Sequence, residues 1–243
     1  MRRGRRRARG KQLAIRFKSW GGKRKGSGPK PTGQFGCDAR GRPRPGVSHR
    51  TRPAHKPRVP VHVTVRAVPG APSLHRFAVA RAIGRVLKRR ARRPLACRVV
   101  HFSLQRDHLH LIVEADDRQA LGRGLQGLLS GLARAANHAA GERGRGKLWR
   151  DRYHARPLRT PTEVRRAMVY VMRNNRKHGS TAFAVDPMST SAWFNGFAGR
   201  TALRNDEPPV ASPVTWLLAK GWNVRGGGPI RDDEQPSPVD VRR

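Results

Sequence analysis

The stretch CRVVHFSLQRDHLHLIVEA, from Cys97 to Ala115, decides the fold that the sequence predicts. It contains two apolar runs, Val99 to Leu104 and Leu109 to Val113, which a short polar segment separates. Runs of this length, rich in Val, Ile, Phe and Leu and broken by a polar turn, are typical of a β-hairpin. Because successive side chains of a strand point to opposite faces, His108 and His110 are expected to share one face.

Two imidazoles side by side on a strand suit two ligands of one metal ion. The alternative is a pair of packed strand histidines that binds no ion, and this alternative is favoured when an H-x-H motif stands alone. The interpretation of His108 and His110 therefore depends on further site residues elsewhere in the chain.

The sequence on either side of the hairpin supplies the other elements of a sheet with helices. Residues 58–68 alternate valine with polar residues, which predicts a half-buried strand. Apolar residues at helical spacing predict helices from Ser73 to about Arg90 and from Asp117 to Ala140. A further short strand is expected around Tyr153 to Leu158. The order predicts an α+β fold, a ferredoxin-like βαββαβ antiparallel sheet with helices on one face.

A third helix is expected to follow this unit and to run to about Lys177. Its start, Thr160-Pro161-Thr162-Glu163, has the pattern of a capping box with proline at the first helical position. Tyr170 lies off the apolar face of this helix, and Asn174 follows it by one turn. A phenol beside an amide, on a helix that could face the histidine pair, is a candidate nucleophile-and-ligand group. The alternative for Tyr170 alone is a partly buried helix tyrosine with its hydroxyl at the rim.

The composition indicates the class of partner. The chain of 243 residues has a formal net charge of +38, with 53 Lys and Arg against 15 Asp and Glu. Such a chain favours polyanions, of which nucleic acid is the leading candidate and an anionic membrane surface the rival. No apolar run approaches the length that spans a bilayer, so no membrane insertion is expected. The only cysteines, Cys37 and Cys97, form no ligand or disulfide pattern, which fits a reducing, cytoplasmic location. With nucleic acid as the partner, the protein is expected to be nucleoid-associated.

Composition also divides the chain into three regions. Residues 1–58 are rich in Arg, Lys, Gly and Pro and are expected to be a disordered basic arm. Residues 59–179 hold the predicted elements, and residues 180–243 are expected to be a mostly irregular tail. Arginines near the third helix are candidates for phosphate contact, the alternative being a solvated basic face. The candidates are Arg150, Arg152, Arg156, Arg159, Arg166 and Arg173.

Four segments in this order carry a resemblance to a known family. They are DHLHLIV (107–113), the leucine-rich LQGLLSGLARAAN, KLWRDRYHARPLRT (147–160) and VYVMRNNRKHG (169–179). Together they resemble single-tyrosine HUH transposases, in particular the REP-associated tyrosine transposases and their insertion-sequence-200-like relatives. The resemblance covers about residues 59–179, which would form an HUH transposase-like domain.

The resemblance implies a metal-dependent enzyme that cleaves and rejoins single-stranded or hairpin DNA. His108 and His110 would bind Mg²⁺ or Mn²⁺, and Tyr170 would attack the phosphate to form a 5′-phosphotyrosyl link. Asn174 matches the position of the third ligand. Some relatives exchange the tyrosine helix between two chains, so a homodimer is also possible.

One departure from the family pattern supports a second hypothesis. Asn174-Asn175 stands where the family has Asn-Pro, and the long arm and extreme charge are unusual. These features leave open the alternative of a domesticated, non-catalytic HUH-fold protein that binds nucleic acid. A nucleoid- or ribosome-associated basic protein is a third hypothesis. The arm supports it, but the ordered pattern of hairpin and helices is more than such a protein needs.

Overall fold

The computed structural model describes residues 54–142, 146–174, 186–199, 201–231, 233–234 and 236. All of them belong to one of the two units into which the chain divides, Gly46–Arg243. The basic arm lies outside the described residues up to position 53, as does any continuation of the third helix beyond position 174. No helix among the described residues is long and apolar enough to cross a membrane.

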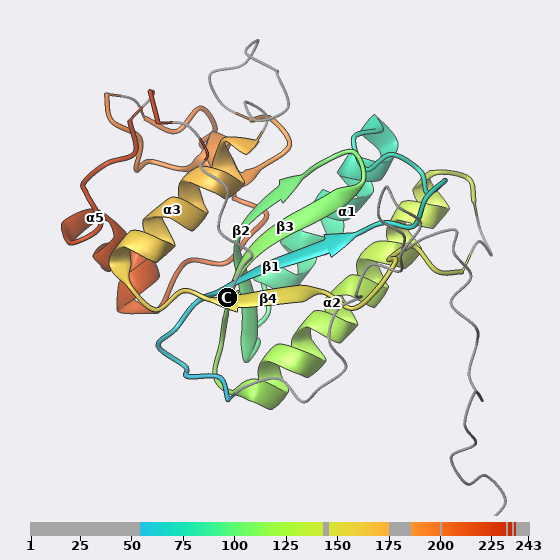
Figure 1. The fold of residues 1–243 in the computed structure, drawn as a ribbon. Helices are drawn as coiled ribbons and strands as arrows, with labels where there is room; N and C mark the ends of the chain where they lie inside the picture. Colours follow the sequence, from blue (N-terminus) through green and yellow to red (C-terminus); the bar gives the residue numbers. More distant parts are fainter. Residues whose placement is uncertain are drawn as a thin grey trace, which may run out of the picture. The chain divides into compact units, whose positions relative to one another are not determined.

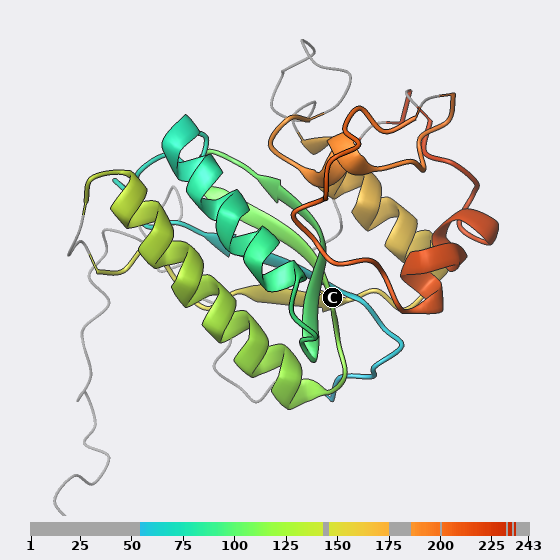
Figure 2. The ribbon, with the colours of Figure 1, turned by 180° about the vertical axis from the view of Figure 1, so that it is seen from behind.

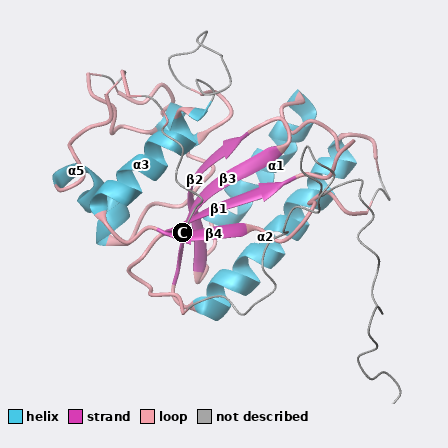
Figure 3. Ribbon diagram, viewed as in Figure 1, coloured by secondary structure: helices cyan, strands magenta, loops and turns pink. Residues whose placement is uncertain are grey.

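The core of the fold is a four-stranded antiparallel sheet in the order β2-β3-β1-β4 (Figures 1 and 3). Its strands are β1 (Val61–Arg66), β2 (Cys97–Leu104), β3 (His108–Ala115) and β4 (His154–Pro157). β2 and β3 form the predicted hairpin, which closes with a hydrogen bond from the Gln105 N–H to the His108 carbonyl. The βαββαβ order and this strand arrangement confirm the predicted α+β, ferredoxin-like architecture.

Two helices cover one face of the sheet, as predicted. α1 (Phe77–Ala91) and α2 (Arg118–Ala139) lie next to each other across it in Figure 2. They pack on alternate residues of the central strands, including Val63, Leu109 and Leu111. α1 begins later than expected because the Ser73 hydroxyl accepts a hydrogen bond from the His75 N–H in the preceding turn and caps no helix.

The third helix, α3 (Pro161–Met172), lies on the opposite face of the sheet (Figures 1 and 2). Its apolar side packs in one cluster with Val100 of β2 and Ile112 of β3. A register shift between Val99 and His101 inserts Val100 into β2, so that Val100 joins this second cluster.

The residues after position 186 are mostly irregular and pack against the sheet and α3. They contain only short helical turns, η1 (Thr190–Trp193), η2 (Leu217–Gly221) and α5 (Trp222–Val224). Trp222 and Ile230 are nevertheless buried in the same cluster as α3. The buried Glu114 carboxylate of β3 accepts hydrogen bonds from the backbone of residues 214 and 215 and from the Thr215 hydroxyl. This segment is therefore an integral part of the fold.

Candidate active site

The sheet face toward α3 carries a row of polar side chains on its central strands. Because Leu109 and Leu111 pack under α1 and α2, the alternate residues His108 and His110 must point the other way. Their rings lie 4.8 Å apart, edge to face, and only 7% and 3% of the two residues is exposed. The predicted pairing of the two imidazoles on one face is thus present.

His108 is oriented by the residue before it in the turn. Its Nδ1 lies 2.7 Å from a carboxylate oxygen of Asp107, whose other oxygen accepts a hydrogen bond from Arg66 at 3.4 Å. Burial opposes the charge on Asp107, but the hydrogen bond from His108 and the charges of His108 and Arg66 lower the pKa of its carboxyl overall. An ionised Asp107 stabilises the tautomer of His108 that carries its proton on Nδ1. The unprotonated Nε2 is then the atom of His108 that could bind a metal ion.

His110 has different partners, both from β1. Its Nδ1 lies 3.0 Å from the Thr64 hydroxyl and 3.3 Å from Nε2 of His62. Thr64 pairs directly with His110 between β1 and β3. His62 pairs with Ile112 and is the next residue of β1 on the same face of the sheet. His110 therefore also presents Nε2, and not Nδ1, as its candidate ligand atom.

His62 is a site residue that the sequence interpretation did not single out. It is buried, and its ring stacks on that of His110 with centroids 5.3 Å apart. Burial lowers the pKa of His62 to about 4, and the charge of nearby Arg156 lowers it further in the same direction. The imidazole is neutral at physiological pH, so Nε2 is able to accept a hydrogen bond.

Tyr170 of α3 reaches the histidines within one protomer. Its ring contacts that of His110 edge to face at 5.0 Å and that of His62 at 5.8 Å. The start of α3 is fixed by the predicted capping box, in which Thr160 accepts from the Glu163 N–H and the Glu163 carboxylate accepts from the Thr160 N–H. Residue 170 remains partly exposed, so the tyrosine lies at the rim of the cluster.

Asn174 follows α3 and is fully buried. Neither its amide oxygen nor its amide nitrogen has a hydrogen-bond partner among the described residues. An unsatisfied buried amide costs about 1–3 kcal/mol, so a ligand for this group would be favourable. Within the same described part of the chain, no group of three or more His, Cys, Asp or Glu side chains is arranged to hold a metal ion.

The six candidate arginines divide into three groups. Arg150, Arg152, Arg159 and Arg166 are exposed. Arg156 is half-buried on β4, beside His62 and 3.6 Å from the Glu163 carboxylate. Arg173 is a wrong prediction: it is 1% exposed, and its guanidinium donates to the carbonyls of Arg231 and Glu234. Its hydrogen bonds join the end of α3 to the C-terminal segment, and its side chain is not exposed for phosphate contact.

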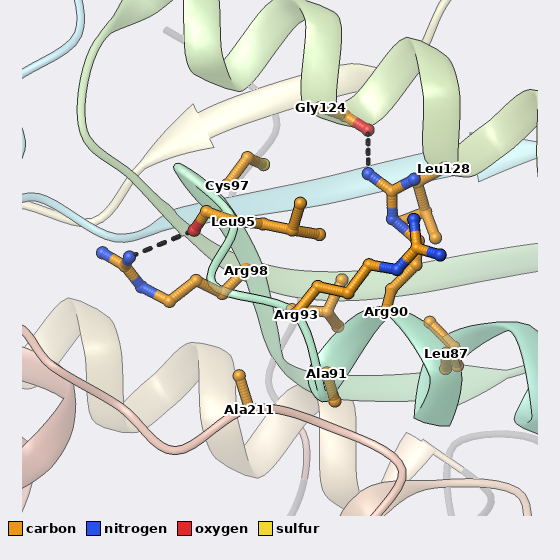
Figure 4. A pocket seen from close by; sticks show the side chains of 11 residues that line it. Leu87, Arg90, Ala91, Arg93, Leu95, Cys97, Arg98, Gly124, Leu128 and Ala211 are labelled. Atoms are coloured by element: carbon orange, nitrogen blue, oxygen red, sulfur yellow. Dashed lines mark hydrogen bonds between the residues drawn. The ribbon is translucent and has the colours of Figure 1, made fainter.

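Two hollows lie away from the histidines. A small cavity of about 20 Å³ between α1, β2 and α2 is lined by Leu87, Leu128 and the Cys97 thiol (Figure 4). Burial raises the pKa of Cys97 to about 11, so its thiol stays protonated and is no nucleophile. A larger, open cleft of about 780 Å³ lies between α2 and the 146–153 segment, with Arg123 and Arg152 in its lining.

Comparisons with known proteins find similarity among solved structures only. The chain matches no protein-family model and no curated protein. Among solved structures it is similar to a REP-associated tyrosine transposase bound to a REP hairpin, with 19% sequence identity and a TM-score of 0.45. The match covers 69% of this chain and 93% of that one.

Proposed function

We propose that this protein is a transposase-like enzyme that cleaves and rejoins single-stranded DNA through Tyr170. The observation that supports this most directly is the 5.0 Å contact between the rings of Tyr170 and His110. A phenol from a helix and a histidine pair from a strand meet on one face of the sheet, although they are 60 residues apart in the sequence. Val164 and Met168 belong to the same buried apolar cluster as Ile112, and this packing holds the helix in its place.

In the proposed reaction the Tyr170 oxygen attacks the phosphorus of a phosphodiester. The bond to the 3′ oxygen breaks, a 5′-phosphotyrosyl link forms, and the proton lost by the phenol is balanced by one gained at the 3′ oxygen. Attack by a 3′-hydroxyl on the link reverses these steps and releases Tyr170. The covalent link conserves the energy of the phosphodiester, so rejoining needs no external energy source.

His108, His110 and Asn174 would hold a divalent cation beside the tyrosine. When bound, the cation would polarise the scissile phosphate and neutralise the charge that develops on it. Asp107 keeps His108 in the tautomer that exposes Nε2, and the buried amide of Asn174 supplies an oxygen donor. Two nitrogens and one oxygen suit Mn²⁺ better than Mg²⁺, which prefers oxygen ligands throughout.

The DNA strand would be held by the basic surface near α3. Arg159 and Arg166 are exposed at the start and middle of this helix, and Arg156 lies beside His62. Arginine binds phosphate oxygens without regard to base sequence. The net charge of +38 predicts that binding weakens steeply as the salt concentration rises.

The test is the formation of a covalent adduct with DNA. The protein is incubated with Mn²⁺ and a labelled single-stranded oligonucleotide that contains a hairpin, and products are separated on a denaturing gel. Tyr170→Phe should abolish the adduct. The chain has only two tyrosines, so Tyr153→Phe is a matched control that should keep it. An adduct that persists in Tyr170→Phe would refute the assignment.

The same experiment distinguishes the alternative of a non-catalytic DNA-binding protein. In that case the oligonucleotide still binds, binding survives removal of metal with EDTA and the His108→Ala substitution, and no adduct forms with any cation. A mobility-shift assay run beside the adduct assay measures this binding directly.

A further inference from the structure

His62 is a buried imidazole to which the proposed reaction gives no role. It lies on β1, where its side chain alternates with the core residues Val61 and Val63 and so faces α3. Only 7% of the residue is exposed, and its ring contacts those of His110 and Tyr170, with centroids 5.3 Å and 5.8 Å away. A polar side chain in such a place is costly unless it makes a specific hydrogen bond.

The hydrogen bond that His62 makes is to the ligand His110. Nε2 of His62 and Nδ1 of His110 are 3.3 Å apart, a distance at which one nitrogen must donate and the other accept. If Nε2 of His110 is to bind a cation, it must be unprotonated, and Nδ1 must then carry the proton and donate. The acceptors within reach of that proton are Nε2 of His62 and the hydroxyl of Thr64.

We propose that His62 is a positioning residue, which accepts the Nδ1–H of His110 and thereby keeps Nε2 of His110 unprotonated, the form that can ligate a cation. The role of this hydrogen bond in metal binding rests on the proposed function. The Nδ1–H tautomer of His110, however, is a property of the metal-free protein and can be measured there. His62 acts through His110 and need not contact DNA or cation.

The two ligands are then oriented by different chemistry. His108 has a carboxylate partner, Asp107, which is itself paired with Arg66 near the surface. His110 lies deeper, and its partners are a neutral imidazole and a hydroxyl. An uncharged acceptor avoids the cost of burying a second carboxylate beneath the helix.

The experiment compares two substitutions of His62 in the full-length protein. His62→Gln keeps a side-chain acceptor, whereas His62→Leu removes it and keeps an apolar side chain of similar size. His101→Leu is the matched control, because His101 is another buried histidine on the same face, which hydrogen-bonds with the Thr190 hydroxyl. Circular dichroism first establishes that each variant is folded.

The first measurement is the tautomer of His110 in the metal-free protein, by long-range ¹H–¹⁵N spectra of the imidazoles. The proposal expects the Nδ1–H form in the wild type, in His62→Gln and in His101→Leu, and a loss of that preference in His62→Leu. An Nε2–H form in the wild type, or an unchanged tautomer in His62→Leu, overturns the proposal.

The second measurement is Mn²⁺ affinity by titration calorimetry. His62→Leu should weaken binding roughly 10- to 100-fold, as loss of such an orienting partner commonly does, while His62→Gln and His101→Leu stay close to the wild type. Equal loss in His62→Leu and His101→Leu would overturn the proposal. If the wild type binds no Mn²⁺ and forms no DNA adduct, the proposed function fails, and the tautomer measurement alone still decides the role of His62.

Discussion

The two faces of the sheet are both buried, but they are built from different side chains. Toward α1 and α2, β3 presents Leu109, Leu111 and Val113, which belong to a large apolar cluster with both helices. Toward α3, the same strand presents His108, His110 and Ile112. A single strand thus contributes to a hydrocarbon core on one side and to a polar cluster on the other.

The second face is itself divided along the strands. Ile112 and Val100 meet the apolar side of α3, whereas His110 is level with Thr64 on one neighbouring strand and Ser103 on the other. Buried polar groups are tolerated when their hydrogen bonds are satisfied, and here they bond mainly with each other. The apolar half anchors the helix, and the polar half is available for chemistry. Four predictions test whether the apolar and polar parts of the two faces have these different roles.

The largest expected effect is on the aliphatic face. Leu111→Ala should lower the free energy of unfolding by about 3 kcal/mol, because Leu111 is fully buried and its loss leaves a cavity. His110→Ala, the neighbouring position on the opposite face, should cost only about 1–2 kcal/mol for its broken hydrogen bonds and yet abolish Mn²⁺ binding. Urea unfolding and metal titration of the two variants measure both quantities. Equal losses of stability in Leu111→Ala and His110→Ala would contradict the view that the aliphatic face contributes more to stability than the polar face.

The second prediction concerns His101, a polar residue of the α3 face that lies outside the site. Burial lowers the pKa of His101 to about 4 from an ordinary 6.5. Between these values the unfolded chain binds a proton that the folded chain does not, so stability should fall as the pH drops from about 6.5 to 4. The loss is on the order of 3 kcal/mol when complete. Urea unfolding at several pH values gives the free energy of unfolding as a function of pH, and its slope should be shallower in His101→Gln than in the wild type. An unchanged slope would contradict the lowered pKa of His101.

The sheet could be predicted because its signals are local. The turn between Leu104 and His108, the alternating valines of β1 and the capping box at Thr160 each act over a few residues, and the structure has all three. The packing of the C-terminal segment could not be predicted. It is held by isolated side chains such as Trp222 and by hydrogen bonds to Glu114, which leave no periodic pattern in the sequence.

The site was only partly predictable for a related reason. The H-x-H pair can be recognised in the sequence because both histidines are on one strand. His62 is on another strand, where it stands alone between valines. Its place beside His110 depends on the register of β1 against β3, which no local pattern specifies. Likewise, a helical pattern does not tell whether an arginine at the end of a helix, such as Arg173, turns toward solvent or toward a later segment of the chain.

The third prediction concerns the residue that orients His108. Asp107→Asn keeps an oxygen acceptor but removes the charge, and we expect Mn²⁺ affinity to fall roughly tenfold. Asp116→Asn is the control, since Asp116 is an exposed acid beyond the far end of β3 that pairs with Arg98. Calorimetric titration of both variants measures the difference. A similar loss in both would indicate a general effect of charge and not the orientation of His108.

The smallest expected effect tests how α3 is held over the polar half of its face. Thr160→Ala removes the N-cap hydroxyl and should cost about 1 kcal/mol of stability. Thr162→Ala, two residues later and exposed, should cost less. Because the apolar packing of Val164 and Met168 on Ile112 remains, the position of Tyr170 should persist and adduct formation should be nearly unchanged in both variants. Thermal unfolding and the adduct assay check the two statements. If loss of the cap greatly reduced the adduct, the hydrogen bonds at the start of α3, and not its apolar contacts with the sheet, would be what positions the tyrosine.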